Sequence, residues 1–279
     1  MSGTFFLGLG GQKCGSSWIQ GYLNGQSGSD FGRLGEYQVW EHALGGVFAR
    51  YRVAEPSGFD KLRARAKMAL GAPEPAAHLR WRLQADPEAY FDYFAALLDK
   101  PGIVRTGDIT PSYAALPAET LRRIRDGFAR RGIAVKVIFS MRDPVARLRS
   151  HLNMDRAKGY TGLELKDFYQ SHEAEARSRY DLTLSAMDSV LDRAEQHVCL
   201  FEELFTPAGI AALSDFADVP TDPQAGGRQV NARAGASAID EGLAQAIARH
   251  YAPAYRAAAE RCPKVASLWQ HADIALTSV

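Results

Sequence analysis

Short apolar runs alternate with amphipathic stretches along most of this chain. Each apolar run is bounded by polar or turn-forming residues, which is the pattern of a strand buried on both faces. We expect strands at residues 4–9, 103–106, 135–140 and 197–201. Apolar positions at helical spacing predict helices at residues 16–25, 117–131, 144–157, 163–193 and 239–261. Strands that alternate with helices predict an α/β fold, with a central parallel sheet flanked by helices.

Proline positions divide the helical stretches further. Pro117 and Pro144 stand where a helix would begin, a position that tolerates proline because its N–H has no helical partner. The stretch 163–193 is long, and we expect it to be broken once or twice. Pro253 predicts an interruption of the last helix for the same reason that proline breaks any helix interior.

Two segments depart from the strand–helix alternation. Residues 41–100 carry several prolines with amphipathic patches between them, and we expect a helical insertion packed on the sheet. Residues 218–236 are rich in Pro, Gly and Ala, which predicts a mobile loop. We therefore expect one domain over 1–279, with the insertion on the side where an acceptor would bind.

The amino-acid composition excludes few classes of protein. The chain has 279 residues, of which 46% are hydrophobic and 23% charged, which is ordinary for a globular domain. Its formal net charge of +1 gives no reason to expect nucleic acid as a partner. The arginines at 122–131 have the spacing of a solvated helix surface, although a groove for a polyanion is the alternative.

Cysteines and targeting signals point to an ordinary cytoplasmic protein. Cys14, Cys199 and Cys262 are widely spaced and odd in number, so we expect neither a disulfide framework nor a zinc site. No run approaches the roughly 18 apolar residues of a membrane span. The start of the sequence lacks the basic region and long apolar stretch of a secretion signal. We therefore expect a cytoplasmic location.

A glycine-rich turn follows the first predicted strand. Residues 10–17 read Gly-Gly-Gln-Lys-Cys-Gly-Ser-Ser, and the next predicted helix begins there. Such a turn points backbone N–H groups, the Lys13 ammonium and the hydroxyls of Ser16 and Ser17 at one place, which is how proteins hold phosphate. The common ATP loop, G-x-x-x-x-G-K-(S/T), has its lysine directly after glycine. Here Lys13 comes two residues before Gly15, which does not fit that loop.

A second candidate anion site follows the third predicted strand. Residues 142–150 read Arg-Asp-Pro-Val-Ala-Arg-Leu-Arg-Ser, with Pro144 at the start of a helix. The Arg142 guanidinium is a planar fork suited to phosphate. Arg142 and Ser150 would share one anion only if the strand end folds back over the first turns of the helix. The alternative is a helix start with a surface arginine cluster.

With both loops present, the chain resembles the sulfotransferases that use 3′-phosphoadenosine 5′-phosphosulfate. Residues 12–19 match that family's P-K-x-G-(S/T)-(S/T)-x-L pattern, with Gln12 in place of proline. Residues 142–150 match its R-D-P-x-x-R-x-x-S pattern at every specified position. The resemblance implies a P-loop-like domain that transfers a sulfuryl group and releases adenosine 3′,5′-bisphosphate. We expect no metal ion, because no carboxylate cluster typical of a magnesium site accompanies the loop.

The resemblance also implies roles for individual residues. Lys13 and the loop residues Gly15, Ser16 and Ser17 would hold the 5′-phosphosulfate, and Lys13 would neutralise the charge that grows on the leaving oxygen. Arg142 and Ser150 would hold the 3′-phosphate. Trp18 would flank the adenine, or it is simply a buried helix residue.

Two further segments are similar to the heparan-type carbohydrate sulfotransferases. Residues 35–40 are similar to that subgroup's K-E-x-x-F-F segment, and residues 107–113, which follow a predicted strand, to E-K-T-P-x-Y. The subgroup's glutamate is the general base, and Glu36 occupies that position. Gly35 and Ile109 replace two lysines of the pattern, which favours a less anionic acceptor.

The general base has rival candidates. A carboxylate partly withdrawn from water has a raised pKa and makes a useful base, which suits Glu36 or Asp108. His42 is a third candidate, since small-molecule sulfotransferases use a histidine. Asp108 and Tyr113 belong to the segment that we expect on the acceptor side. Arg228 lies where the family closes a loop over the nucleotide, so it would cap the 3′-phosphate or remain solvated.

We therefore expect a sulfotransferase that acts on the hydroxyl or amine of a glycan or small metabolite. Two alternatives remain open at this point. One is a nucleotide kinase or hydrolase with an atypical phosphate loop, and the other is a nucleotide-binding protein without catalytic activity. The sequence gives neither the acceptor nor the oligomeric state.

Overall fold

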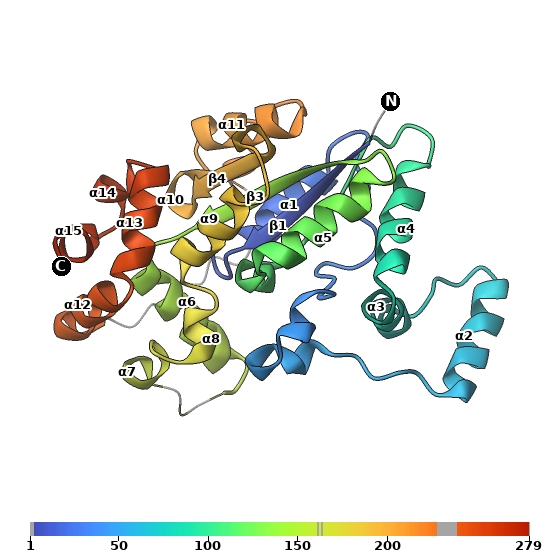
Figure 1. Cartoon of the computed structure of the whole chain (residues 1–279), viewed down its shortest axis with the longest axis horizontal. Coiled ribbons are helices and arrows are strands. Elements are labelled where there is room, and N and C mark those ends of the chain that lie inside the picture. The colour runs from blue at the N-terminus through green and yellow to red at the C-terminus, as the bar shows by residue number, and fades with distance from the viewer. Residues whose placement is uncertain (1–2, 161, 163, 228–238, 279) are drawn as a thin grey trace.

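A parallel β-sheet forms the centre of the protein. The computed structural model describes residues 3–160, 162, 164–227 and 239–278. Its sheet contains β1 (Thr4–Gly10), β2 (Arg105–Ile109), β3 (Ala134–Met141) and β4 (Gln196–Leu200) in the order β2-β1-β3-β4. All neighbouring strands run parallel, so their carboxyl ends meet along one edge, where open α/β sheets bind ligands. The α/β prediction is confirmed (Figure 1).

Alternate residues of β1 are buried on opposite faces of the sheet. Phe5, Leu7 and Leu9 belong to the larger apolar core, and Phe6 belongs to the smaller one. The larger core is covered by α4 (Pro87–Leu98), α5 (Ala118–Ala129), α9 (Tyr180–Asp188) and α13 (Ala252–Arg261). The smaller core is covered by α1 (Ser16–Asn24) and α11 (Pro207–Ala217). Helices therefore flank both faces, as the buried strands require.

The second strand lies later in the chain than the sequence predicts. β2 covers Arg105–Ile109, not 103–106, so Gly107 and Asp108 are inside the strand instead of following it. Gly107 is needed there because a Cβ atom would lie 2.6 Å from both the Phe31 ring and the Phe6 carbonyl oxygen. Glycine and aspartate are both rare in strands, which is why the pattern misplaced this one.

The expected helix breaks are present. The stretch after α6 (Pro144–Ala157) contains α7 (Leu165–Phe168), α8 (His172–Glu175) and then α9, followed by the short η4 (Arg193–Glu195). The last stretch is divided at Tyr251 into α12 (Glu241–His250) and α13, with Pro253 in the first turn of α13. Shorter elements complete the chain: η3 (Pro111–Ala115), α10 (Phe201–Leu204), η5 (Ala225–Gly227), α14 (Val265–Leu268) and α15 (Ala272–Thr277).

Residues 41–100 are helical, as expected, but their helices differ in how they pack. The segment contains η1 (Glu41–Leu44), η2 (Gly46–Tyr51), α2 (Gly58–Ala69), α3 (Ala76–Ala85) and α4. Helix α4 buries Tyr90, Phe91 and Phe94 in the main core. Helix α2 buries only Ala64 and stands at the edge of the molecule (Figure 1).

Some sequence predictions concern residues without a described structure. Residues 228–236 of the predicted loop, including Arg228, lie outside the described residues. Among the helices that are described, none has the length and apolar character to cross a lipid bilayer.

Candidate active site

The glycine-rich turn that follows β1 has a backbone conformation that few residues other than glycine can adopt. Gly10 has φ +103°, and a Cβ atom there would lie 2.5 Å from the Pro111 carbonyl oxygen. Gly15 has φ +91°, and its Cβ atom would lie 2.4 Å from the Leu204 Cδ2 atom. Lys13 also has a left-handed backbone, at φ +68°. Such strain in a non-glycine residue persists only where the surrounding structure imposes it, and it is concentrated at functional sites.

Hydrogen bonds fasten this turn to the end of β3. The Gly11 N–H donates to the Ser140 carbonyl oxygen at 2.6 Å, and the Ser140 hydroxyl donates to the Cys14 carbonyl oxygen at 2.6 Å. The Cys14 side chain is fully buried, and burial raises the pKa of its thiol to about 11. Cys14 is therefore a packing residue, and the turn is held at both of its ends.

The turn ends in the first helix, α1, whose start is left open. Gly15, which has no side chain, occupies the capping position, and among the described residues no side-chain cap of the first turn is seen. Ser16 is buried and Ser17 is exposed. Uncapped N–H groups and the positive end of the helix dipole attract an anion. Lys13 and Gly15 thus lie in the turn, and Ser16 and Ser17 form the first residues of α1; their role in binding phosphate stays a prediction.

Arg142 begins the second predicted anion site and contacts the first. Its Nη1 donates to the Lys13 carbonyl oxygen at 3.3 Å, and its guanidinium carbon lies 4.2 Å from the centre of the Phe201 ring. Its Nε atom is buried without a hydrogen-bond partner among the described residues. The Arg142 carbonyl oxygen accepts from the Tyr180 hydroxyl at 2.8 Å. A fixed guanidinium with an unused donor is a suitable group for binding phosphate.

Asp143 acts as the cap of α6. Its Oδ1 accepts from the Ala146 N–H at 3.0 Å, and its Oδ2 accepts from the Tyr255 hydroxyl at 3.0 Å. These contacts fix the corner at which β3 turns into α6, and with it the backbone of Arg142. Ser150, on the same helix, is half-buried. No hydrogen bond to its hydroxyl is seen among the described residues, and its role on the 3′-phosphate stays a prediction.

Arg147, the second arginine of the same motif, is fully buried. Its Nε donates to the Ser178 hydroxyl at 2.9 Å and its Nη2 to the Ala174 carbonyl oxygen at 3.4 Å. It forms no ion pair with any described carboxylate, and neither does Arg142. The two guanidinium charges lie near the phosphate turn, which fits an anionic ligand, and they also act on the Glu202 and Glu173 carboxylates.

Glu36 lies on a segment that two parts of the chain hold in place. Its carbonyl oxygen accepts from Arg80 Nη2 at 2.9 Å, while the neighbouring Tyr37 N–H donates to the Thr110 hydroxyl at 3.0 Å. Burial raises the pKa of the half-buried Glu36 carboxyl above its ordinary value, opposed by a hydrogen bond from Gln38 and by the charges of Arg80, Lys158 and Arg177. A carboxylate with a raised pKa is suited to accepting a proton.

Asp108 and Tyr113 lie beneath this segment, in a buried hydrogen-bond network. The Asp108 carboxylate accepts from the hydroxyls of Tyr113 at 2.8 Å, Tyr90 at 3.0 Å and Thr110 at 2.6 Å. Burial raises its pKa to about 6, and these hydroxyls oppose the shift. The Tyr113 hydroxyl also accepts from the Val39 N–H at 3.0 Å. Both side chains are fully buried, and their contacts position the Glu36 segment.

Glu41 is a buried carboxyl that the sequence analysis missed. It is fully buried, its Oε1 accepts from the Ser112 hydroxyl, and its Oε2 has no described partner. Burial raises its pKa to about 7, and the negative charges of Asp108 and Glu36 contribute. The only sequence signal was an acidic residue directly after the apolar pair Val39 and Trp40. Glu41 therefore lies close enough to Glu36 to influence its charge.

His42 and Trp18 have contacts that give them structural roles. The His42 Nδ1 atom lies 2.7 Å from the Val39 carbonyl oxygen, and burial lowers the pKa of its ring. The Trp18 indole donates to the Ala225 carbonyl oxygen at 3.2 Å and stacks on the Tyr22 ring. None of these contacts among the described residues places His42 beside Lys13, and the Trp18 ring is already stacked on Tyr22. Their proposed roles as base and as adenine contact stay predictions.

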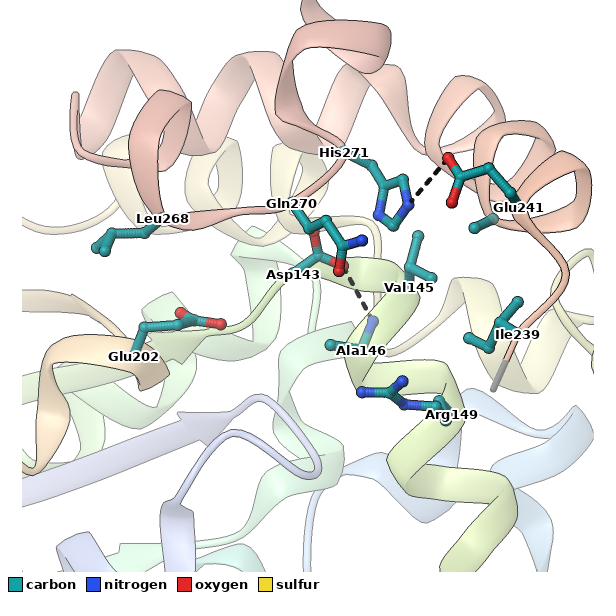
Figure 2. Close-up of a pocket in the computed structure, with 11 residues that line it drawn as sticks. Asp143, Val145, Ala146, Arg149, Glu202, Ile239, Glu241, Leu268, Gln270 and His271 are labelled. Atoms are coloured by element: carbon teal, nitrogen blue, oxygen red, sulfur yellow. Dashed lines mark hydrogen bonds and ion pairs between the residues drawn. The ribbon is translucent and has the colours of Figure 1, made fainter. Parts of the chain in front are cut away.

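A pocket of about 230 Å³ adjoins the Arg142 corner but differs from it in charge. The side chains that line it include those of Asp143, Arg149, Glu202, Glu241, Gln270 and His271 (Figure 2). Its carboxylates repel phosphate, and neither Lys13 nor Glu36 lines it. We therefore place the candidate site at the phosphate turn and the Arg142 corner. No group of side chains suited to a metal ion occurs among the residues that the structure describes.

Comparison with known proteins supports the fold. No protein-family model and no curated protein matches the sequence. The structure is similar to a sulfotransferase from Alicyclobacillus acidocaldarius, with a TM-score of 0.64 and 17% identity over 94% of this chain and 96% of that one. It is also similar to the sulfotransferase domain from the curacin biosynthetic pathway, with a TM-score of 0.52 and 15% identity over 94% of this chain and 98% of that domain. This chain therefore has the fold of sulfotransferases.

Proposed function

We propose that this protein is a sulfotransferase that uses 3′-phosphoadenosine 5′-phosphosulfate. The observation that carries the proposal is the hydrogen bond from Arg142 to the Lys13 carbonyl oxygen, which joins two anion-binding corners at one edge of the sheet. A ligand with a phosphate at each end needs two such corners. The sulfotransferase fold supports the same conclusion.

The residues present fit this cosubstrate. The uncapped start of α1 and the Lys13 side chain would hold the 5′-phosphosulfate. The unused Nε donor of Arg142, together with Ser150, would hold the 3′-phosphate. The cosubstrate supplies an activated sulfuryl group whose bond to the bridging phosphate oxygen breaks during transfer.

The protein's own residues would promote transfer by position and charge. Glu36 would accept the proton of the acceptor hydroxyl as the acceptor oxygen forms its bond to sulfur. Lys13 and the N–H groups of the turn would stabilise the negative charge left on the phosphate oxygen. These roles need no bound metal ion, because the negative charge on the leaving phosphate oxygen would develop beside Lys13 and the start of α1.

The acceptor would approach from the side of residues 41–100. Support comes from Arg80 on α3, whose guanidinium binds the carbonyl oxygens of Glu36 at 2.9 Å and Tyr37 at 2.9 Å. The insertion therefore positions the proposed base directly. We infer that the acceptor is a hydroxyl or amine on a carbohydrate or small metabolite, and that its identity depends on this insertion.

Transfer of labelled sulfate from the cosubstrate to a panel of sugars, phenols and amines tests the function. We expect the wild type to transfer sulfate, and the transfer rate to fall at least about 100-fold in Lys13→Ala and in Glu36→Gln. The exposed controls Lys166→Ala and Glu260→Gln should keep the wild-type rate. Calorimetry should show binding of adenosine 3′,5′-bisphosphate without Mg²⁺.

Two other results would contradict the proposal. Tight binding of ATP that requires Mg²⁺ would indicate a kinase or hydrolase. Binding of the bisphosphate with no transfer to any acceptor, including those in a cell extract, would indicate a nucleotide-binding protein without catalytic activity.

A further inference from the structure

Helix α2 exposes large apolar side chains instead of burying them. Phe59 is 72% exposed, Leu62 is 66% exposed, and Leu70, the residue that ends the helix, is 88% exposed. Ala64 is the only buried residue of this 12-residue helix. Apolar side chains gathered on one exposed element mark an interaction surface more often than single exposed ones do.

These side chains lie on one side of the helix. At the ordinary turn of about 100° per residue, Phe59, Leu62, Ala66, Ala69 and Leu70 fall within an arc of about 100°. We call these five residues the apolar arc. The buried Ala64 falls on the opposite side. The side of α2 that carries Ala64 therefore faces the rest of the protein, and the apolar arc faces away from it.

Basic side chains border the apolar arc on both sides. By the same helical geometry, Arg63 and Lys67 lie about 20° and 60° beyond one edge, and Arg65 lies about 40° beyond the other, with Lys61 farther round the helix. Lys61 pairs with Glu55, and its ammonium lies 4.6 Å from the centre of the Trp81 ring on α3. Arg63, Arg65 and Lys67 form no ion pair with any residue that the structure describes. Three positive charges are thus left unneutralised beside an exposed apolar strip.

The acidic residue of the helix does not interrupt this arrangement. Asp60 lies about 80° beyond the edge of the apolar arc, farther from it than Arg63, Arg65 and Lys67, and accepts a hydrogen bond from the Ser57 hydroxyl at 2.6 Å. The apolar arc itself carries no side chain that donates or accepts a hydrogen bond. A surface of this kind offers no directional contacts to a specific protein partner, but it matches a layer that is apolar inside and negatively charged at its surface.

From this complementarity we propose that α2 binds the surface of an anionic lipid bilayer. The helix lies in the plane of the interface, with Phe59, Leu62 and Leu70 inserted among the acyl chains. Arg63, Arg65 and Lys67 reach the phosphate groups, since long basic side chains can bury their stems and keep their charges at the surface. A strongly polar face, exposed Phe and Leu and flanking basic residues are the features of helices that lie on membranes. This proposal does not depend on the proposed sulfotransferase activity.

Vesicle co-sedimentation of the full chain tests the proposal. We expect binding to vesicles of phosphatidylcholine with about one-third phosphatidylglycerol, and binding at least about tenfold weaker to phosphatidylcholine alone. Raising the salt concentration should weaken the binding, because the attraction of the exposed charges is screened.

Substitutions on α2 separate the apolar and the charged contributions. The triple variant Arg63→Gln, Arg65→Gln, Lys67→Gln should bind the anionic vesicles about 100-fold more weakly, whereas neutralising Arg122, Arg156 and Lys166 should have little effect. The triple variant Phe59→Ser, Leu62→Ser, Leu70→Ser should lose binding at least about tenfold. The matched control is Leu182→Ser on α9, because Leu182 is 59% exposed. Thermal unfolding should be unchanged in all of these variants, since the substituted side chains are exposed.

Three results would overturn the proposal. One is a wild type that does not bind the anionic vesicles, and the second is binding that the α2 variants leave unchanged. The third is a lipid-free dimer, detected by light scattering, that the serine variant converts to a monomer. That last result would assign the apolar arc to a second copy of the chain.

Discussion

Arg142 donates a hydrogen bond to the carbonyl oxygen of Lys13. The two candidate anion-binding motifs, which are far apart in the sequence, are therefore in direct contact. The same guanidinium lies over the Phe201 ring, with its carbon 4.2 Å from the ring centre. Its Nε atom remains buried and unpartnered among the described residues. A side chain held this firmly, with one donor unused, is arranged for a ligand before the ligand arrives.

The first prediction concerns that unused donor. Arg142→Lys keeps the charge but loses the planar fork, so we expect the affinity for adenosine 3′,5′-bisphosphate to fall about 10- to 100-fold. The affinity for adenosine 5′-monophosphate, which lacks the 3′-phosphate, should fall much less. Isothermal calorimetry measures both. Arg149→Lys is the control, because Arg149 lines the neighbouring pocket. Equal losses for the two nucleotides would place the 3′-phosphate elsewhere.

The second prediction concerns the geometry of the phosphate turn. Gly15→Ala adds a methyl group at φ +91° and 2.4 Å from Leu204, so we expect a loss of about 1–3 kcal/mol in the free energy of unfolding, together with weaker nucleotide binding. Gly21→Ala on the same helix meets no atom within 4 Å and should stabilise the protein by up to about 1 kcal/mol. Urea denaturation measures both variants. A Gly15→Ala protein as stable as the wild type would mean that the turn has another conformation in solution.

The sequence predicted the fold wherever local pattern and packing agree. β1 and β3 are apolar runs buried on both faces, and Pro144 marks the start of α6 correctly. β2 was misplaced because it contains Gly107 and Asp108. Gly107 is required there by the close Phe31 ring, and Asp108 is stabilised there by hydroxyl groups such as that of Tyr90. These partners come from other parts of the chain. Local propensity carries no information about such partners.

For the site, the sequence identified the residues but not their contacts. Lys13 and Arg142 each stand out in a motif, yet only the parallel sheet brings the ends of β1 and β3 side by side. Glu41 was missed because a single acidic residue looks like an exposed one. Its burial comes from the packing of η1 against η3, where Ser112 donates to it.

The third prediction distinguishes a positioning role of Asp108 from a catalytic one. Asp108→Asn removes the charge that three buried hydroxyl groups now bind, so we expect a loss of about 2–4 kcal/mol in the free energy of unfolding. Tyr113→Phe should also destabilise the protein, by about 1–3 kcal/mol. Chemical denaturation measures both. A stable Asp108→Asn protein that binds nucleotide but transfers no sulfate would instead make Asp108 the base.

The fourth prediction concerns the pH dependence of transfer. Glu36 must be ionised to accept a proton, and burial raises its pKa, so kcat should fall as the pH drops through a value above the ordinary glutamate range. Lys158 favours the ionised form, so Lys158→Gln should shift this fall to higher pH. Lys166→Gln is the matched control. The profile is measured by initial rates at saturating substrates, and an unshifted profile in Lys158→Gln would argue against Glu36 as the base.

The last prediction concerns the effect of Glu41 on stability. Its pKa is raised to about 7 in the folded protein, so the folded state holds this proton more tightly than the unfolded state does. Stability is therefore lost as the pH rises from the ordinary glutamate range through about 7. Glu41→Gln mimics the protonated carboxyl and removes this loss. The free energy of unfolding of Glu41→Gln minus that of the wild type should therefore increase by about 2 kcal/mol from pH 5 to pH 8.

Urea denaturation at several pH values between 5 and 8 provides the comparison for Glu41. The exposed Glu260→Gln serves as the control, and its stability should follow that of the wild type at every pH. A difference between Glu41→Gln and the wild type that stays constant with pH would contradict the prediction. It would mean that the Glu41 carboxyl keeps the same charge in the folded and unfolded states, and that water reaches it. In that case Glu41 would not influence the protonation of Glu36 in the way its burial implies.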